Sequence, residues 1–294
     1  MQLKTNFALK LLLILIISLT ISCRGQGASQ VAEFSDQSQI LPATITVVNW
    51  NAQKGKNPQF ASDLKLLLEQ EKPDIVFLQE ARADFFKPEQ MGGYFAEGWS
   101  YPWPGGESVG VLTLSRVPPT RIEPVPTQYR EFNVTAPKVS LVTEYPLPNG
   151  ENLLALNVHL LNFEVWSLKK IRYQLEDLKA IMADHTGPIV MAGDFNTWNQ
   201  KRLELVKEIT RDVKLTEVTD FPDGRTTGDT KSELWNDILG VEKNLPLDRV
   251  FFLGFDPTDA RVLKYDTSDH KPILVKLKLR YQNFNRLPPG ANLE

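Results

Sequence analysis

Strand-like segments joined in two different ways restrict the fold of this chain more than any other feature of its sequence. The β-branched run Thr44–Val48 and the apolar run Ile75–Leu78 are separated by apolar residues at helical spacing. The runs Lys138–Tyr145 and Leu153–Leu160 are separated only by a short segment of Pro, Asn and Gly residues. Because both crossover and hairpin connections occur, the chain is predicted to be an α/β protein with two packed sheets and helices on the outside.

The remaining elements follow the same patterns. Further strands are predicted at Val109–Leu114, Ile189–Met191, Arg249–Leu253, Ala260–Lys264 and Ile273–Leu279. A long amphipathic helix is predicted from one apolar stripe, formed by Leu168, Ile171, Leu175, Leu178 and Met182. A second helix includes Leu203 and Val206. No internal repeat or domain boundary is visible in the sequence.

The composition describes a globular protein and excludes some kinds of site. Of the 294 residues, 42% are hydrophobic, which is enough apolar mass for a sizeable core in one large domain or two small ones. The formal net charge of −3 leaves no large basic surface that would hold a polyanion by counterion release. An acidic balance still suits phosphate chemistry, because acidic ligands can hold a metal ion where a phosphate binds. Cys23 is the only cysteine, so the sequence predicts neither an intrachain disulfide nor a structural zinc site.

The N-terminus has the pattern of an export signal. Lys4 and Lys10 precede the apolar segment Leu11–Ile21, and a small residue and Cys23 follow it. This end of the segment resembles a bacterial lipobox, in which the cysteine is lipidated. We interpret residues 1–23 as a signal peptide of the lipoprotein type with Cys23 as the lipidation site, and a plain cleaved signal is the alternative. Both interpretations place the protein outside the cytoplasm, either anchored to a membrane by lipid or secreted into the periplasm or beyond.

Two polar stretches flank the predicted folded domain, which covers residues 44–280. Residues 24–43 are rich in Gln, Ser, Gly and Ala and are predicted to be a flexible tether. Residues 281–294 have no apolar pattern and are predicted to be a polar tail.

Polar residues stand at the ends of the predicted strands, where a rigid scaffold meets an accessible loop. They are Asn51, Glu80, His159, Asp194, Asn196, Asp248, Asp269 and His270. Each of them alone also fits a structural role, such as a turn former for Asn51 or a helix cap for Asp194 or Asn196. One shared site explains all of these positions better than a separate structural role for each. The third histidine, His185, follows the amphipathic helix and is predicted to have a structural role there.

The residue types at these strand ends suit a metal ion and a water molecule. Glu80, Asp194 and Asp269 are hard oxygen ligands of the kind that Mg²⁺ binds, and Asn51 adds a neutral oxygen. A carboxylate that is not committed to a metal can orient or deprotonate a water molecule. The sequence therefore favours magnesium-assisted chemistry, with Mn²⁺ as the alternative metal.

The remaining strand-end residues suit the charge that develops on a phosphate during reaction. Asn196 and His159 can donate hydrogen bonds to phosphate oxygens. Asp248 can fix the tautomer of His270 or stabilise its protonated form.

Six short segments that contain these strand-end residues follow one another in the order found in the endonuclease/exonuclease/phosphatase superfamily of DNase I-like proteins, and the chain resembles this superfamily. The matching segments are Trp50-Asn51, Leu78-Gln79-Glu80, Asn157-Val158-His159-Leu160, Gly193-Asp194-Phe195-Asn196, Leu247-Asp248-Arg249-Val250 and Ser268-Asp269-His270. Longer segments, such as Gly187 to Trp198, resemble the YafD-like bacterial branch of this superfamily.

The resemblance implies a fold and a set of roles. The fold would be a four-layer α/β/β/α sandwich with two packed mixed sheets and the site at one end. Asn51, Glu80 and Asp269 would serve the metal, and Asp194 would orient or activate the attacking water. Asn196 and His159 would hold phosphate oxygens, and His270 with Asp248 would stabilise the transition state.

The function predicted from the sequence is a Mg²⁺-dependent phosphodiesterase, either a nuclease or a hydrolase of lipid or sugar phosphates. Its partners would be nucleic acid or phospholipid substrates, and we expect a monomer. Lys54 and Asn162 are candidate substrate contacts, as is Arg116, and a solvated surface role is the alternative for each. A surface lipoprotein that uses the same fold only for binding is the rival hypothesis.

Overall fold

The computed structural model describes residues 26–31, 38–83, 93–100, 108–130, 137–164, 167–221, 225 and 245–280. The predicted signal peptide with Cys23 and the predicted polar tail 281–294 lie outside the described residues. No helix within the described part of the chain is long and apolar enough to cross a membrane.

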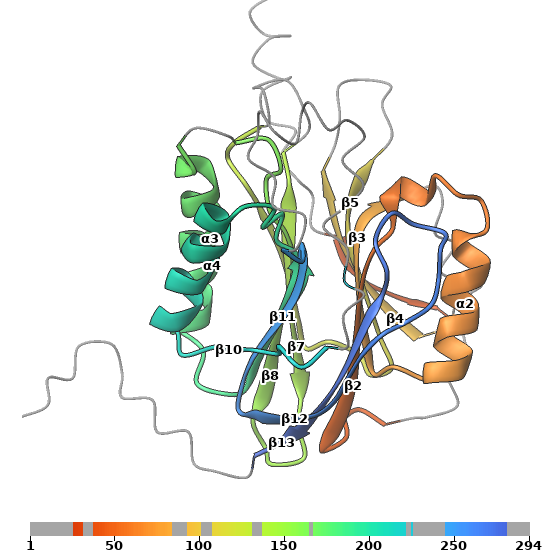
Figure 1. Cartoon of the computed structure of the whole chain (residues 1–294). Coiled ribbons are helices and arrows are strands. Elements are labelled where there is room, and N and C mark those ends of the chain that lie inside the picture. Colours follow the sequence, from red (N-terminus) through yellow and green to blue (C-terminus); the bar gives the residue numbers. More distant parts are fainter. Residues whose placement is uncertain are drawn as a thin grey trace, which may run out of the picture.

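The described residues form four layers, with two sheets between helices (Figure 1). The first sheet has the strand order β1-β4-β5-β3-β2-β13-β12. Its strands are β1 (Gln26–Val31), β4 (Gly93–Ser100), β5 (Val109–Ser115), β3 (Ile75–Arg82), β2 (Thr44–Asn51), β13 (Ile273–Leu279) and β12 (Phe255–Val262). The helix α2 (Phe60–Glu71) covers its outer face.

The second sheet has the strand order β10-β11-β9-β8-β7-β6. Its strands are β10 (Thr216–Glu217), β11 (Asp248–Leu253), β9 (Ile189–Asp194), β8 (Asn152–His159), β7 (Val139–Pro146) and β6 (Arg121–Pro126). The helices α3 (Lys169–Ala183) and α4 (Gln200–Asp212) cover its outer face (Figure 1). This arrangement confirms the predicted α/β/β/α sandwich of two mixed sheets.

Each sheet contains one parallel pair of strands at its centre. In the first sheet β2 runs parallel to β3, and α2 connects them. In the second sheet β8 runs parallel to β9, and α3 connects them. The other paired strands are antiparallel, including the predicted hairpin of β7 and β8. The two crossovers place the ends of four central strands at one edge of the sandwich.

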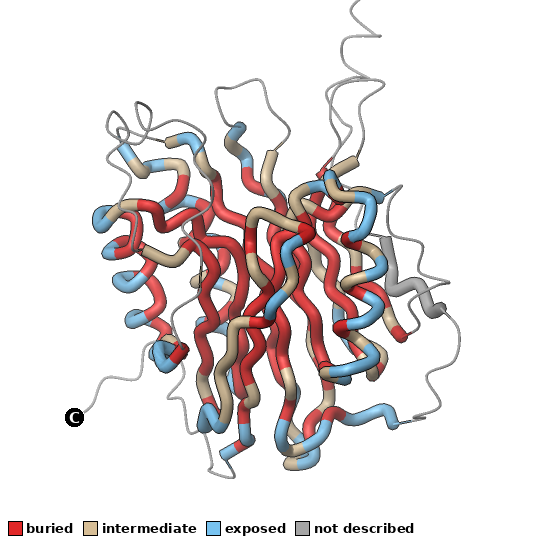
Figure 2. Tube along the Cα trace, turned by 45° about the vertical axis from the view of Figure 1, so that its right-hand side comes forward, coloured by how far each residue is buried: buried red, intermediate tan, exposed pale blue. Residues whose placement is uncertain are grey.

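Three apolar layers hold the sandwich together, and their residues follow the strand and helix periods of the sequence. The layer between the sheets includes Ile45, Val47 and Phe77. Alternate residues of the same strands, such as Val48 and Val76, face α2. A third layer packs the second sheet against α3 and α4. Figure 2 shows the result as a block of largely buried strands, with most exposed residues on helix faces, in loops and on the edge strands.

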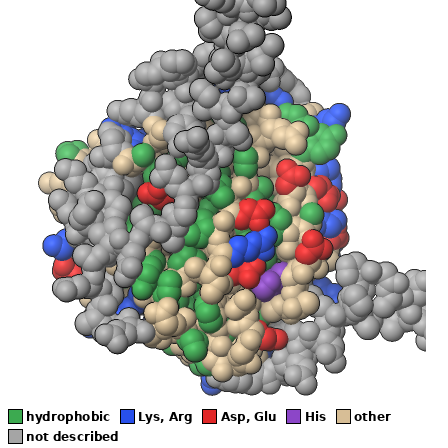
Figure 3. Space-filling view, turned by 180° about the vertical axis from the view of Figure 1, so that it is seen from behind, with side chains coloured by type: hydrophobic (Ala, Val, Ile, Leu, Met, Phe, Trp, Pro, Cys, Tyr) green, Lys and Arg blue, Asp and Glu red, His purple; other side chains and the backbone are tan. Residues whose placement is uncertain are grey.

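The face of the molecule that lies at the back in Figure 1 carries both hydrophobic and charged side chains. Hydrophobic side chains form a strip across the middle of that face, and acidic and basic side chains lie beside it (Figure 3). One charged cluster on the second sheet joins Arg121 of the edge strand β6 to Glu144 of β7 at 2.8 Å.

Several segments differ from the sequence-based expectation. Within the predicted tether 24–43, residues Gln26–Val31 form the edge strand β1 and Leu41 is buried between the sheets, so ordered structure begins before Thr44. The strands β4 and β6 were not predicted, because glycines interrupt the pattern of β4 and Pro124 and Pro126 interrupt that of β6. Proline is tolerated in β6 because this strand is at the edge of its sheet.

Candidate active site

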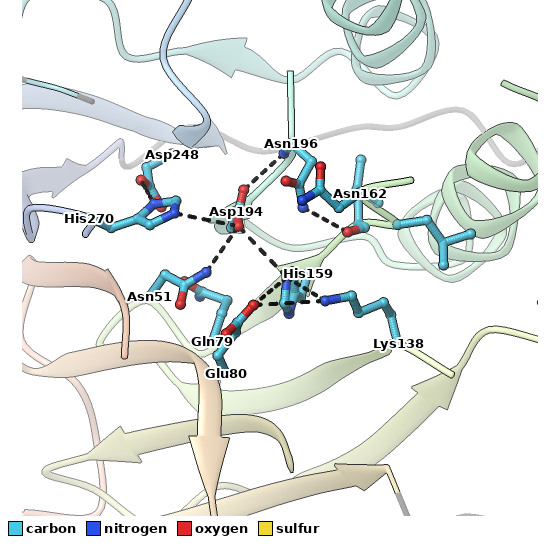
Figure 4. Close-up of polar contacts among 12 residues, drawn as sticks. Asn51, Gln79, Glu80, Lys138, His159, Asn162, Asp194, Asn196, Asp248 and His270 are labelled. Carbon is cyan, nitrogen blue, oxygen red and sulfur yellow. Dashed lines mark hydrogen bonds and ion pairs between the residues drawn. The ribbon is translucent and has the colours of Figure 1, made fainter. Parts of the chain in front are cut away.

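The ends of β2, β3, β8 and β9 bring the predicted residues together at one edge of the sandwich (Figure 4). Asn51, at the end of β2, donates from Nδ2 to Oδ2 of Asp194 at 3.0 Å. His159, at the end of β8, has its Nε2 atom 3.7 Å from the same oxygen. The hydrogen bond from Asn51 joins the two sheets directly at the site.

The residue before Asp194, Gly193, must be glycine because β9 passes very close to β8 at this point. A Cβ atom at this position would lie 1.9 Å from the carbonyl oxygen of Val158. Only glycine allows the backbone of β9 to approach β8 this closely. In this register Asp194 lies directly opposite His159.

Asp194 is almost completely buried, with 2% of its surface exposed. Its Oδ1 atom accepts a hydrogen bond from the backbone N–H of Asn196 at 2.9 Å. Burial raises the pKa of Asp194 to about 6, although the charge of His270 opposes this shift. A carboxylate with this pKa is ionised at neutral pH and can still accept a proton.

His270 and Asp248 form the predicted pair, with 2.6 Å between Nδ1 of the imidazole and Oδ2 of the carboxylate. Burial alone would lower the pKa of His270, but the charges of Asp248, Asp194 and Asp269 raise it to about 10. Its Nε2 atom lies 4.0 Å from Oδ2 of Asp194. His270 is therefore an imidazolium that presents an N–H group to the site.

Glu80 reaches the site through an irregularity in β3. The pairing of β3 with β5 shifts by one residue between Leu78 and Ala81, and Glu80 has a φ of 49°. A residue with this left-handed backbone is strained, at a cost of about 1 kcal/mol. Regular alternation would turn Gln79 and Glu80 to opposite faces, and the bulge re-aims the second of them.

Lys138 is a site residue that the sequence analysis did not single out. It precedes β7, and its Nζ atom lies 3.0 Å from Nε2 of His159 and 4.0 Å from Oε1 of Glu80. Burial lowers the pKa of His159 well below its usual value, and the charges of Lys138, His270 and Lys54 lower it further. No local signal marks Lys138, because only the pairing of β7 with β8 places it beside His159.

A chain of buried side chains, which we call the inter-sheet network, supports Asp248 from behind. It consists of Asn49, Gln79, Asn157 and Asp248. Asn49 donates to Asp248 at 3.0 Å, and Nε2 of Gln79 donates to both Asn49 and Asn157 at 2.8 Å. The sequence does contain one signal for this network. Asn49 and Asn157 stand two residues before Asn51 and His159, so each pair faces the same side of its strand.

Arg202, the second residue missed in the sequence, is a buried guanidinium in α4. Its Nη1 atom donates to the carbonyl oxygens of Leu161 at 3.0 Å and Asn196 at 2.8 Å. It thereby joins the loop after His159 to the loop after Asp194. Arg202 also lies over the ring of Trp198 at 4.4 Å.

The candidate phosphate contacts Asn196 and Asn162 lie in these two loops. Asn196 has a φ of 49° and donates from Nδ2 to the carbonyl oxygen of Leu160 at 2.9 Å. Asn162 accepts a hydrogen bond from Nε1 of Trp198 at 3.1 Å. Both asparagines are therefore held in place by contacts between the loops.

Three further residues that were predicted for the site are Lys54, Asp269 and Arg116, and they differ in where they lie relative to it. Lys54 is exposed in the short turn η1 (Gln53–Gly55), close enough for its charge to affect the pKa of His159. Asp269 follows Ser268, whose hydroxyl donates to the carbonyl oxygen of Asn51 at 2.6 Å.

The prediction for Arg116 was wrong. It lies beside Asp74 where β3 begins, at the opposite end of the strand from Glu80, because β5 runs antiparallel to β3.

The other histidine has the structural role expected of it. His185 makes a hydrogen bond from Nε2 to the carbonyl oxygen of Asn152 at 3.0 Å, which ties the end of α3 to the start of β8.

The donor atoms at this edge fit a magnesium ion. Among the described residues, no three Asp, Glu, His or Cys side chains come together as a ready metal-binding group. Glu80 supplies a partly exposed carboxylate, Oδ1 of Asn51 accepts a hydrogen bond from the backbone N–H of Gln53 at 3.0 Å, and Asp269 adjoins Ser268, which donates to the backbone of Asn51. Mg²⁺ commonly binds through one or two carboxylates and keeps several waters, so these oxygens suit it.

The fold and the site together define the class of protein. A four-layer sandwich that ends in a buried Asp and an Asp–His pair, beside further carboxylate and amide oxygens, carries the groups that hydrolysis of a phosphoester requires. Residues 48–270 match the sequence profile of the Endonuclease/Exonuclease/phosphatase family, and the chain belongs to this family.

One curated relative and two solved structures show the same likeness. The chain is 32% identical over 237 residues to a UPF0294 protein of Vibrio parahaemolyticus, covering 80% of this chain and 78% of the relative. An endonuclease/exonuclease/phosphatase from Beutenbergia cavernae superposes with a TM-score of 0.60 at 21% identity, covering 80% of this chain and 72% of that one. A mannosyl-6-phosphatase of Bacteroides thetaiotaomicron superposes with a TM-score of 0.57 at 15% identity, covering 79% and 99%. The assignment to the YafD-like branch stays a prediction.

Proposed function

We propose that this protein is a Mg²⁺-dependent phosphodiesterase that acts outside the cytoplasm. The observation that carries the proposal is the convergence of Asp194, Asn51 and the protonated His270 around one buried point. Oδ2 of Asp194 accepts a hydrogen bond from Asn51 and lies 4.0 Å from Nε2 of His270. This gap is too long for a direct hydrogen bond, and an oxygen atom of a ligand that lies to one side of the pair can be within hydrogen-bond distance of both groups.

Hydrolysis adds water across one P–O bond. The water oxygen bonds to phosphorus, its proton passes to Asp194, and the leaving-group oxygen departs from the opposite side. Asp194 suits the role of base because its pKa of about 6 lies near neutrality. His270 donates from Nε2 to a phosphate oxygen as negative charge builds there, and Asp248 keeps the imidazole protonated.

Magnesium would be held by Glu80, Asn51 and Asp269, directly or through water. When bound there, it supplies positive charge to a phosphate oxygen. Asn196 lies on the other side of Asp194 and offers an amide donor to the same phosphate.

The first test compares the purified protein with an Asp194→Asn variant on bis-p-nitrophenyl phosphate, with Mg²⁺ or with EDTA. The variant keeps the shape of the side chain but removes the base, so we expect kcat to fall by about 10²- to 10⁴-fold. EDTA should abolish turnover by the parent protein. The matched control is Asp212→Asn, an exposed position on α4. Turnover that persists in EDTA, or equal turnover in Asp194→Asn, would refute the mechanism.

The substrate class is tested on a panel of phosphoesters. DNA, RNA, sphingomyelin and phosphatidylinositols represent nucleic-acid and lipid substrates, and p-nitrophenyl phosphate represents monoesters. We expect turnover of at least one diester class. The rival hypothesis of a non-catalytic binding protein predicts no turnover across the whole panel together with binding of a partner.

The pattern of the N-terminal residues supports the proposed location outside the cytoplasm and the proposed lipidation. We propose that Cys23 is lipidated and that the domain works at a membrane surface as a monomer. Mass spectrometry of the mature N-terminus would find a diacylglyceryl mass on Cys23, and Cys23→Ala would release the protein from the membrane fraction. A mature chain that begins elsewhere, or a dimer in light scattering, would contradict the respective part of this proposal.

A further inference from the structure

Lys138 occupies a place in the site that neither the strand-end pattern nor the predicted roles explain. Its side chain is 20% exposed, although lysine is among the residues least often buried. In Figure 4 it extends from the start of β7 toward His159 and Glu80. Holding a long, flexible side chain in one position costs conformational entropy. The position therefore calls for a functional explanation.

The hydrogen bond between Lys138 and His159 has only one direction. A lysine ammonium carries three donors and no acceptor. At 3.0 Å, Lys138 therefore donates to Nε2 of His159, and the proton of the neutral imidazole is on Nδ1.

The ammonium itself remains available to a ligand. Among the described residues, its nearest carboxylate oxygen, Oε1 of Glu80, is 4.0 Å away, which is too far for a hydrogen bond. Within the part of the chain that the structure describes, one N–H group of Lys138 is used by His159 and two remain. Lysine commonly binds phosphate as a compact point charge.

We propose that Lys138 binds an oxygen of the substrate phosphate and that the contact with His159 holds the Lys138 ammonium in the site. This inference rests on the proposed function, since it assigns the phosphate contact of that site. It also adds a preference. A fixed positive charge attracts a dianionic phosphomonoester more strongly than a monoanionic diester, so Lys138 supports terminal phosphates as well as diesters.

The first experiment does not depend on turnover. Isothermal titration with inorganic phosphate in the presence of Mg²⁺ compares the parent protein with Lys138→Met, Lys138→Arg and Lys278→Met. Loss of one charge-assisted contact should weaken phosphate binding by about 10- to 100-fold in Lys138→Met. Lys138→Arg should be intermediate because it keeps the charge. Lys278→Met is the matched control, since Lys278 is exposed and pairs with Thr44 at the far end of the sheet. Unchanged phosphate affinity in Lys138→Met would overturn the proposal.

The second experiment reads the tautomer of His159 by ¹⁵N NMR in metal-free protein. We expect an unprotonated Nε2 and a protonated Nδ1 in the parent protein, and a different pattern in Lys138→Met. A proton on Nε2 of the parent protein would overturn the assigned direction of the hydrogen bond. If Lys138→Met fails to fold, as judged by circular dichroism, Lys138→Gln, which removes the charge, replaces it in the phosphate titration, and the tautomer is read in the parent protein alone.

The third experiment tests the charge preference by kinetics. Lys138→Met should lower kcat/KM more for p-nitrophenyl phosphate than for bis-p-nitrophenyl phosphate, whereas Lys278→Met should change neither. Equal losses on both substrates would overturn the preference. A parent protein that hydrolyses nothing would refute the proposed function, and the phosphate affinity and the tautomer would still decide the role of Lys138.

Discussion

The polar contacts between the sheets differ from those between α3 and α4, although their distances are alike. The inter-sheet network has hydrogen bonds of 2.8 to 3.0 Å among side chains that are almost completely buried. Between the helices, Arg172 donates to Glu208 at 2.7 Å and Lys179 donates to Asp212 at 2.7 Å. Of these side chains, Lys179 is partly exposed and the other three are exposed. Buried groups have no water to replace a lost partner, whereas exposed groups do. Burial, and not distance, therefore decides what each contact contributes.

The largest effect should come from Gln79→Leu, which removes the central donor of the inter-sheet network. Asn49 and Asn157 would each keep a buried oxygen without this partner, so we expect stability to fall by about 2 kcal/mol. The loss is limited because Oε1 of Gln79 is itself buried and has no hydrogen-bond partner among the described residues. Urea denaturation gives the change, and the exposed Gln128→Leu is the control. A change of equal size in both variants would contradict the distinction.

An intermediate effect, which depends on pH, should come from Asp248→Asn at the end of the same network. The pKa of His270 is raised from 6.5 to about 10, so its charge stabilises the fold fully below pH 6.5, and this contribution is lost as the pH rises through about 10. Asp248→Asn removes the carboxylate charge and should lower the pKa of His270. The difference in stability between parent and variant should be largest in acid and disappear near pH 10. An NMR titration of His270 in metal-free protein measures the shift, and an unchanged pKa would count against the pair.

The smallest effect should come from Lys179→Met, which breaks the ion pair with Asp212 on the helix surface. Solvent and salt screen this contact, so we expect no measurable change in melting temperature. Thermal unfolding at physiological salt provides the measurement. A decrease as large as that of Gln79→Leu would mean that exposed and buried contacts contribute alike in this protein.

Much of the fold was predictable because hydrophobic periodicity is a local property. The central strands and both predicted crossover helices are found close to their predicted positions, and the strand ends were the correct place to look for Asp194 and His159. The strands β4 and β6 were missed because glycine and proline obscure their period, and their pairing is set by distant segments.

The parts of the site that were missed depend on contacts between segments far apart in the chain. Lys138 meets His159 only because β7 pairs with β8, and Arg116 was misplaced because the direction of β5 is not visible in its residues. The bulge at Glu80 is likewise a property of strand pairing. Local sequence identifies the candidates, and the sheet register decides which of them meet.

The two parallel strand pairs at the centres of the sheets have a consequence for refolding. Asn51 and Glu80 come from the pair in the first sheet, and His159 and Asp194 come from the pair in the second. Neither half of the sandwich contains a complete set of reactive groups, so an intermediate with one formed sheet would be inert. The return of hydrolysis after dilution from urea would therefore time the docking of the two sheets, while the recovery of circular dichroism would time their separate formation.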